Sequence, residues 1–154
     1  MKTTSPRSTR THWLLLATLL AGGAVAQVPA GLPPPGTMSA KMPVGMEIYM
    51  SMAVSDANQH VSQQMGTSEV EAKMRAMKGC NDKYKGCVEL ITFPIRNHCM
   101  GMASDKGATG NARGLFINVA EAGKTQDGEL ANKSLEQCKA GGGTQCEAQA
   151  DYCF

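Results

Sequence analysis

Aromatic residues and long hydrophobic runs are both scarce in this 154-residue sequence. Aromatic side chains make up 5% of the chain, and no basic stretch follows the amino-terminal segment, so the sequence lacks the stacking platforms and positive surface of nucleic-acid-binding proteins. The longest apolar run, residues 13–25, contains two glycines and has about 13 residues, whereas a bilayer core needs roughly 20. The sequence therefore predicts neither nucleic-acid binding nor stable membrane insertion of the mature chain.

Signatures of catalysis are missing as well. No paired acid and base, free nucleophile or cofactor motif stands out, so we expect a protein without catalytic residues or cofactors. After residue 26 the chain has two histidines, His60 and His98, and an isolated histidine is most often a solvated or capping group. A small secreted hydrolase is the alternative if one of them lies in a deep pocket with an acidic partner.

Acidic and glycine-rich patterns also have structural explanations. The helix dipole favours negative charge near helix starts. Four acidic residues lie near predicted helix starts, namely Glu69, Glu71, Glu121 and Asp127. Residues 141–144 (GGGT) follow a predicted helix, whereas a phosphate-binding loop leads from a strand into a helix and carries a lysine.

The amino-terminal segment has the three parts of a secretory signal peptide. Lys2, Arg7 and Arg10 form its basic part, residues 13–25 its apolar centre, and residues 24–26 (AVA) a small-x-small cleavage site. We expect cleavage near Ala26 and a mature chain in the periplasm or outside the cell.

Cysteine is the main structural signal in the rest of the chain. All six cysteines follow the cleavage site, and an even number in an exported chain predicts disulfides. Twice, one cysteine ends a predicted helix and the next begins a strand after a short loop, which favours local pairing. The predicted pairs are Cys80 with Cys87, Cys138 with Cys146, and Cys99 with Cys153. Spacings of six and seven residues do not fit a zinc site.

The remaining pattern predicts a leader followed by one domain. Residues 27–46 are rich in proline and methionine and are expected to be flexible, and residues 47–154 form a single cysteine-rich domain. Strands are predicted at 47–54, 59–65, 87–93, 99–104, 115–120 and 146–153. One helix is predicted at 68–79, and a second runs from a cap at Asp127 to the glycines at 141–143.

The first predicted helix begins with a capping box. Ser68 is followed three residues later by Glu71, and Val70, Met74 and Met77 then recur at helical spacing, which predicts a buried face.

The two halves of the domain resemble each other. MSMAVSD at 50–56 is similar to MGMASD at 100–105, and the segment 70–80 that leads to Cys80 is similar to the segment 130–138 that leads to Cys138. This predicts a strand-strand-helix-strand pseudo-repeat. The expected fold class is α+β, a small disulfide-stabilised domain whose antiparallel sheet carries two helices.

Methionine is unusually frequent, and one group is closely spaced. The members of this group are Met38, Met42, Met46, Met50 and Met52. Thioethers are soft ligands that select Cu(I), so a Cu(I)-binding protein is a second alternative. Pro43 and Gly45 argue against a helical methionine face, and methionine also fills cores.

The overall layout resembles a known family. It combines YMSMA at 49–53, a helix to Cys80, a strand from Cys87, NHCMGMA at 97–103, a helix to Cys138, Cys146 and a terminal Cys153. This layout is similar to that of the secreted bacterial family called domain of unknown function 4189, over residues 47–154. The resemblance implies the fold and an export route but no catalytic residue.

Together these patterns predict an exported, non-catalytic binding module of a Gram-negative bacterium. We expect it to recognise a protein or a cell-envelope component, for example as an inhibitor or immunity-type protein. The sequence does not indicate which residues bind.

Overall fold

The computed structural model of the protein describes residues 34–154. The predicted signal peptide and the first part of the leader lie outside the described residues. The elements follow in the order α1 (Thr37–Lys41), β1 (Tyr49–Ser55), β2 (His60–Gly66), α2 (Glu69–Asn81), β3 (Val88–Pro94), β4 (His98–Asp105), β5 (Leu115–Glu121), α3 (Glu129–Ala140) and β6 (Cys146–Cys153), with a 3-10 turn at Asp56–Asn58. Every predicted strand and both predicted helices are present.

The strand-strand-helix-strand pseudo-repeat is present in the structure. The strand orders are β2-β1-β3 and β5-β4-β6, all pairs are antiparallel, and the first strand of each half is central. The predicted sheet is divided into two sheets of three strands. Pro94 ends β3 because it cannot donate to a ladder, and residues 95–97 carry the chain into the second sheet.

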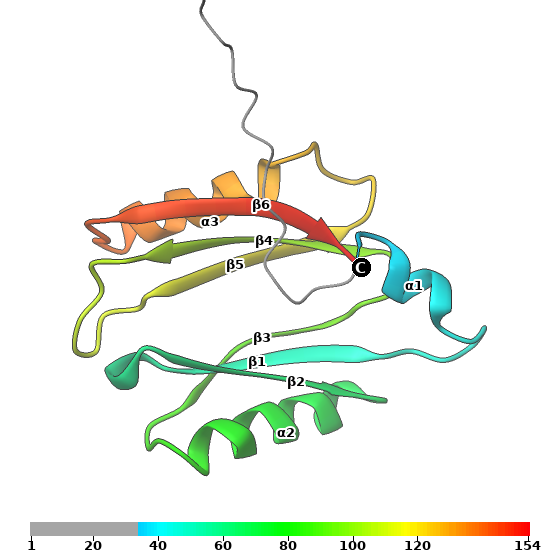
Figure 1. Ribbon diagram of the computed structural model, residues 1–154, viewed down its shortest axis with the longest axis horizontal. Helices are drawn as coiled ribbons and strands as arrows, with labels where there is room; N and C mark the ends of the chain where they lie inside the picture. Colours follow the sequence, from blue (N-terminus) through cyan, green and yellow to red (C-terminus); the bar gives the residue numbers. More distant parts are fainter. Residues whose placement is uncertain (1–33) are drawn as a thin grey trace, which may run out of the picture.

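The molecule has four layers (Figure 1). The helix α2 packs on β1, β2 and β3, whereas α3 packs on β4, β5 and β6, so each helix covers the outer face of its own sheet. Between the sheets lies one core of buried side chains, namely Met42, Met50, Met52, Phe93, Ile95, Met100, Tyr152 and Phe154. Among residues 34–154, no helix has the length and hydrophobicity needed to cross a bilayer.

The helix α2 begins as predicted but buries a different face. The Ser68 hydroxyl accepts a hydrogen bond from the Glu71 amide at 3.2 Å. The buried residues are Ala72, Ala76 and Cys80, whereas Val70 and Met74 point to solvent. Small side chains let the helix approach the sheet closely, so the predicted burial is wrong for Val70 and Met74. The third predicted residue, Met77, is partly buried against the cluster that contains Ala76 and Cys80.

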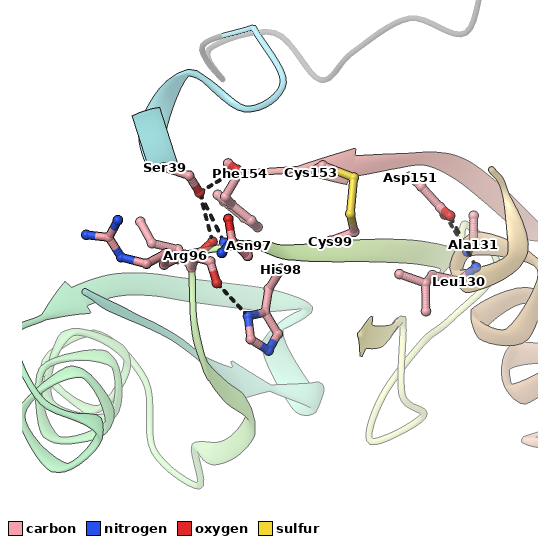
Figure 2. Close-up of a disulfide and its surroundings, with 11 residues drawn as sticks. Ser39, Arg96, Asn97, His98, Cys99, Leu130, Ala131, Asp151, Cys153 and Phe154 are labelled. Carbon is pink, nitrogen blue, oxygen red and sulfur yellow. Dashed lines mark hydrogen bonds between the residues drawn. A yellow bond between two sulfur atoms is a disulfide. The ribbon is translucent and has the colours of Figure 1, made fainter. Parts of the chain in front are cut away.

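The helix α3 is capped by a residue far away in the sequence. Its N-cap position is Gly128, at φ +79°, so the prediction that Asp127 caps it is wrong. Instead, the Asp151 carboxylate of β6 accepts hydrogen bonds from the amides of Leu130 at 3.3 Å and Ala131 at 2.7 Å (Figure 2). This contact fixes the start of α3 on its sheet.

Three disulfides join the residues that the sequence paired. They are Cys80–Cys87, Cys99–Cys153 and Cys138–Cys146. The first and third close the loop after each helix, and the second joins β4 directly to β6 (Figure 2).

Some of the described residues in the segment predicted as a flexible leader contact the domain. The Gly36 amide donates to the Cys153 oxygen at 2.8 Å, and the Ser39 hydroxyl donates to the Phe154 main-chain oxygen at 2.6 Å (Figure 2). Met42 is buried in the core between the sheets. These contacts are long-range, so local composition did not reveal them.

Candidate functional site

An apolar groove lies on the solvent face of α2. Val70 and Met74 are 66% and 67% exposed, and they are neighbours because residues four apart share one helix face. The groove has a volume of about 470 Å³. We call it the α2 groove, and its lining residues are Ser68, Val70, Glu71, Met74, Arg75 and Lys78.

Ion pairs neutralise the rim of the α2 groove. The Arg75 guanidinium lies 2.6 Å from Glu71, and the Lys78 ammonium lies 2.6 Å from Asp82. Hydrogen bonds from the Thr67 amide and hydroxyl lower the pKa of Glu71, and Arg75 lowers it further, so this carboxylate stays charged. With its charges already paired, the groove favours apolar contact over ionic attraction.

A chain of polar contacts holds α2 on its sheet. Lys73 of α2 forms an ion pair with Glu89 of β3, which lowers the pKa of Glu89. The Thr92 hydroxyl lies 2.6 Å from Glu89 and 2.8 Å from the buried Ser51 hydroxyl. A carboxylate only accepts, so Thr92 gives its single proton to Glu89 and Ser51 donates to Thr92. The α2 groove is therefore built on a fixed helix.

A second, polar cavity lies where the chain crosses between the sheets. This cavity, the seam cleft, has a volume of about 570 Å³. Its lining residues are Glu47, Pro94, Arg96, Asn97, His98, Glu121 and Ala122. His98 and Glu121 are direct partners in the β4–β5 register. His60, the other predicted candidate, packs elsewhere on Tyr84, with ring centroids 4.7 Å apart.

The ring of His98 has a defined orientation (Figure 2). Its Nδ1 lies 2.8 Å from the Arg96 carbonyl oxygen, which can only accept, so Nδ1 carries a proton and, in the neutral ring, the lone pair is on Nε2. The Arg96 guanidinium donates to the carbonyl oxygens of Pro43 and Met46, each at 2.8 Å, and lies 3.3 Å from Glu47. The seam cleft therefore combines one basic nitrogen with carboxylates on its walls.

The other candidates from the sequence are the methionines and cysteines considered as metal ligands. Met42, Met50 and Met52 belong to the core between the sheets, Met38 is partly buried against this core, and Met46 is 43% exposed. Within residues 34–154, no three His, Cys, Asp or Glu side chains are placed to hold a metal ion, and every cysteine there is paired.

The glycine-rich loop after α3 is held by an acidic side chain. The Asp105 carboxylate accepts hydrogen bonds from the amides of Gln145 at 2.8 Å, Gly107 at 3.0 Å and Thr144 at 3.3 Å. These bonds, that of Gln145 foremost, lower the pKa of Asp105. The loop donors that a phosphate would need are thus already used.

Sequence reasoning missed the α2 groove because it assigned Val70 and Met74 to the core. The signal that locates the buried face is the series Ala72, Ala76 and Cys80, in which small residues recur every four positions.

The comparisons with known proteins support the layout rather than a mechanism. Neither the curated proteins nor the solved structures include a match to this chain. A family described as a domain of unknown function, DUF4189, matches residues 49–153, which span both halves of the pseudo-repeat. The chain therefore belongs to the DUF4189 family.

Proposed function

We propose that this protein is an exported binding module that holds a protein partner of the cell envelope on the α2 groove. The observation that carries the proposal is the exposure of Val70 and Met74, about two-thirds each, side by side on a fixed helix. Burying two such side chains against a partner is worth about 1.5–3 kcal/mol each. An inhibitor or immunity-type protein is one concrete form of this function.

The pseudo-repeat supplies an internal comparison. The buried positions of α2 correspond to Leu130, Ser134 and Cys138 of α3 when the helices are aligned on their cysteines. In this alignment Met74 corresponds to Asn132, which is exposed. Because the same position is polar in the other half, the apolar groove is not a requirement of the fold.

Export is supported by the predicted signal peptide and by the three disulfides, which persist in oxidising compartments.

Co-purification from envelope extracts tests the proposal. The double variant Val70→Ser, Met74→Ser removes the apolar contact, and Val44→Ser is the matched control because Val44 is fully exposed outside the groove. We expect mass spectrometry to identify a protein that wild type and the control retain and the groove variant loses. If wild type retains no protein, or if the groove variant retains the same one, the proposal fails.

The seam cleft favours a second candidate, a small hydrolase. In the neutral ring, Nε2 of His98 is the nitrogen that can act as a general base, and Glu47 and Glu121 are acidic residues in the same cavity. The test is turnover of chromogenic ester and glycoside substrates and of peptidoglycan by wild type, His98→Gln and the control His60→Gln. A hydrolase requires turnover that only His98→Gln abolishes, and absence of turnover in wild type removes this candidate.

A further inference from the structure

The methionines of this protein differ widely in their access to solvent. Met50, Met52 and Met100 in the core are at most 2% exposed. Met74 is 67% exposed and Met46 is 43% exposed. A thioether reacts only with an oxidant that reaches its sulfur, so these two groups must oxidise at different rates.

We propose that Met74 is an oxidation site through which peroxide-class oxidants weaken binding at the α2 groove. The oxidation itself follows from the structure alone, whereas its effect on binding rests on the proposed function. An exported protein meets such oxidants directly, and the Met74 side chain is 67% exposed on the outer face of α2.

The reaction needs no other group of the protein. The sulfur lone pair attacks one oxygen of hydrogen peroxide, an S–O bond forms as the O–O bond breaks, and the second oxygen leaves as water after a proton transfer. Sulfur loses two electrons and peroxide gains them. The product is a sulfoxide, which is polar and chiral where the thioether was apolar.

The groups around Met74 determine which hydrogen bonds a sulfoxide at this position can form. The nearby cations are already engaged, Arg75 by Glu71 and Lys78 by Asp82. The sulfoxide oxygen therefore depends on water for hydrogen bonds, and a partner that covers the groove removes that water. We expect binding to weaken by about tenfold or more, because an unpaired polar group is costly to bury.

Oxidation of Met74 should leave the fold intact. The side chain lies on the solvent face of α2, opposite the buried residues Ala72 and Ala76. Oxidation of Met50 or Met100 would instead place a polar group in the core and unfold the domain. Peroxide should therefore leave the protein folded when it oxidises the exposed Met74 and unfold it when it oxidises a core methionine.

Peptide mapping by mass spectrometry after timed exposure of the folded protein to hydrogen peroxide tests the site. We expect Met74 to oxidise fastest, with Met46 next, and the three core methionines to react slower by on the order of tenfold or more. In guanidinium the rates should become equal, which shows that the fold provides the protection. If Met74 reacts no faster than Met50 and Met100 in the folded protein, the inference is overturned.

The effect on binding is measured by the envelope co-purification. Peroxide should reduce capture by wild type and by Met46→Leu, while capture by Met74→Leu should stay at its own untreated level. Methionine sulfoxide reductase should restore capture by wild type. If peroxide oxidises Met74 and capture does not fall, the regulatory inference is wrong although the binding function stands. If the untreated protein captures nothing, the proposed function fails. The oxidation rates then still show whether Met74 is the preferred oxidation site.

Discussion

Replacing Gly101 by alanine is expected to destabilise the protein strongly, because α3 lies against this position of β4. A Cβ atom at residue 101 would lie 2.1 Å from the Ala131 nitrogen and 2.3 Å from the Leu130 carbonyl carbon. Both are main-chain atoms that cannot rotate away, so the start of α3 must move. Overpacking of this kind costs about 1–3 kcal/mol.

Movement of α3 also breaks polar contacts. The Asp151 carboxylate would lose the amides that it caps, worth about 1 kcal/mol. The Ser134 hydroxyl, which donates to the Gly101 oxygen at 2.9 Å, would lose a buried hydrogen bond, worth about 1 kcal/mol. We therefore expect Gly101→Ala to lower the free energy of unfolding by about 3–5 kcal/mol.

Gly114→Ala is the matched control for this prediction. Its Cβ would lie 2.0 Å from Oε1 of Gln59, which is the end of a flexible side chain and can move aside. We expect a loss of about 1 kcal/mol, for the hydrogen bond from Gln59 to the Ala112 oxygen. The assay is urea unfolding of the oxidised protein followed by circular dichroism. If Gly101→Ala loses no more stability than Gly114→Ala, the close approach of α3 to β4 is refuted.

Three further predictions concern single contacts. Hydrogen bonds lower the pKa of Asp105 in the folded protein below its ordinary value of 3.8, so the stability that the Asp105 carboxylate contributes is present above pH 3.8 and is lost as the pH falls through the folded pKa. The free energies of unfolding of wild type and Asp105→Asn, measured in urea, should therefore converge in acid. A difference that stays constant with pH would contradict this. Arg113 donates to both carboxylate oxygens of Asp56, at 2.8 and 2.9 Å. A lysine cannot form this two-bond pair, so Arg113→Lys should lower the free energy of unfolding by about 0.5–1 kcal/mol. An unchanged urea midpoint would show that the paired geometry is unimportant. Ser39→Ala removes a hydrogen bond that holds α1, so it should speed tryptic cleavage after Lys41 several-fold. The free energy of unfolding of the whole domain should change by under about 1 kcal/mol. Equal cleavage rates would show that the hydroxyl does not hold α1.

Features that depend on neighbouring residues were predictable from the sequence. The local disulfides join cysteines seven and eight residues apart, so helix ends and short loops were enough to pair them. The Ser68 cap follows from a four-residue pattern. The apolar segment 47–54 predicted the strand that forms β1.

Apart from the Cys99–Cys153 pair, the features that depend on distant residues were not predictable. Asp151 caps a helix that begins 22 residues earlier in the chain, and no local pattern marks it. The seam cleft joins Glu47, His98 and Glu121, which only the two-sheet arrangement brings together. Hydropathy alone also misplaced Met74, because small residues rather than large ones determine how closely a helix packs on a sheet.

The repeated topology makes each half of the domain dependent on the other. One half alone would leave the apolar face of its sheet, with Met50, Met52 and Phe93, open to water. A half on its own would therefore need a second copy of itself, as a two-fold homodimer, to cover this face. In the whole chain residues 95–97 tether the two halves, so this face is covered within one molecule at any protein concentration.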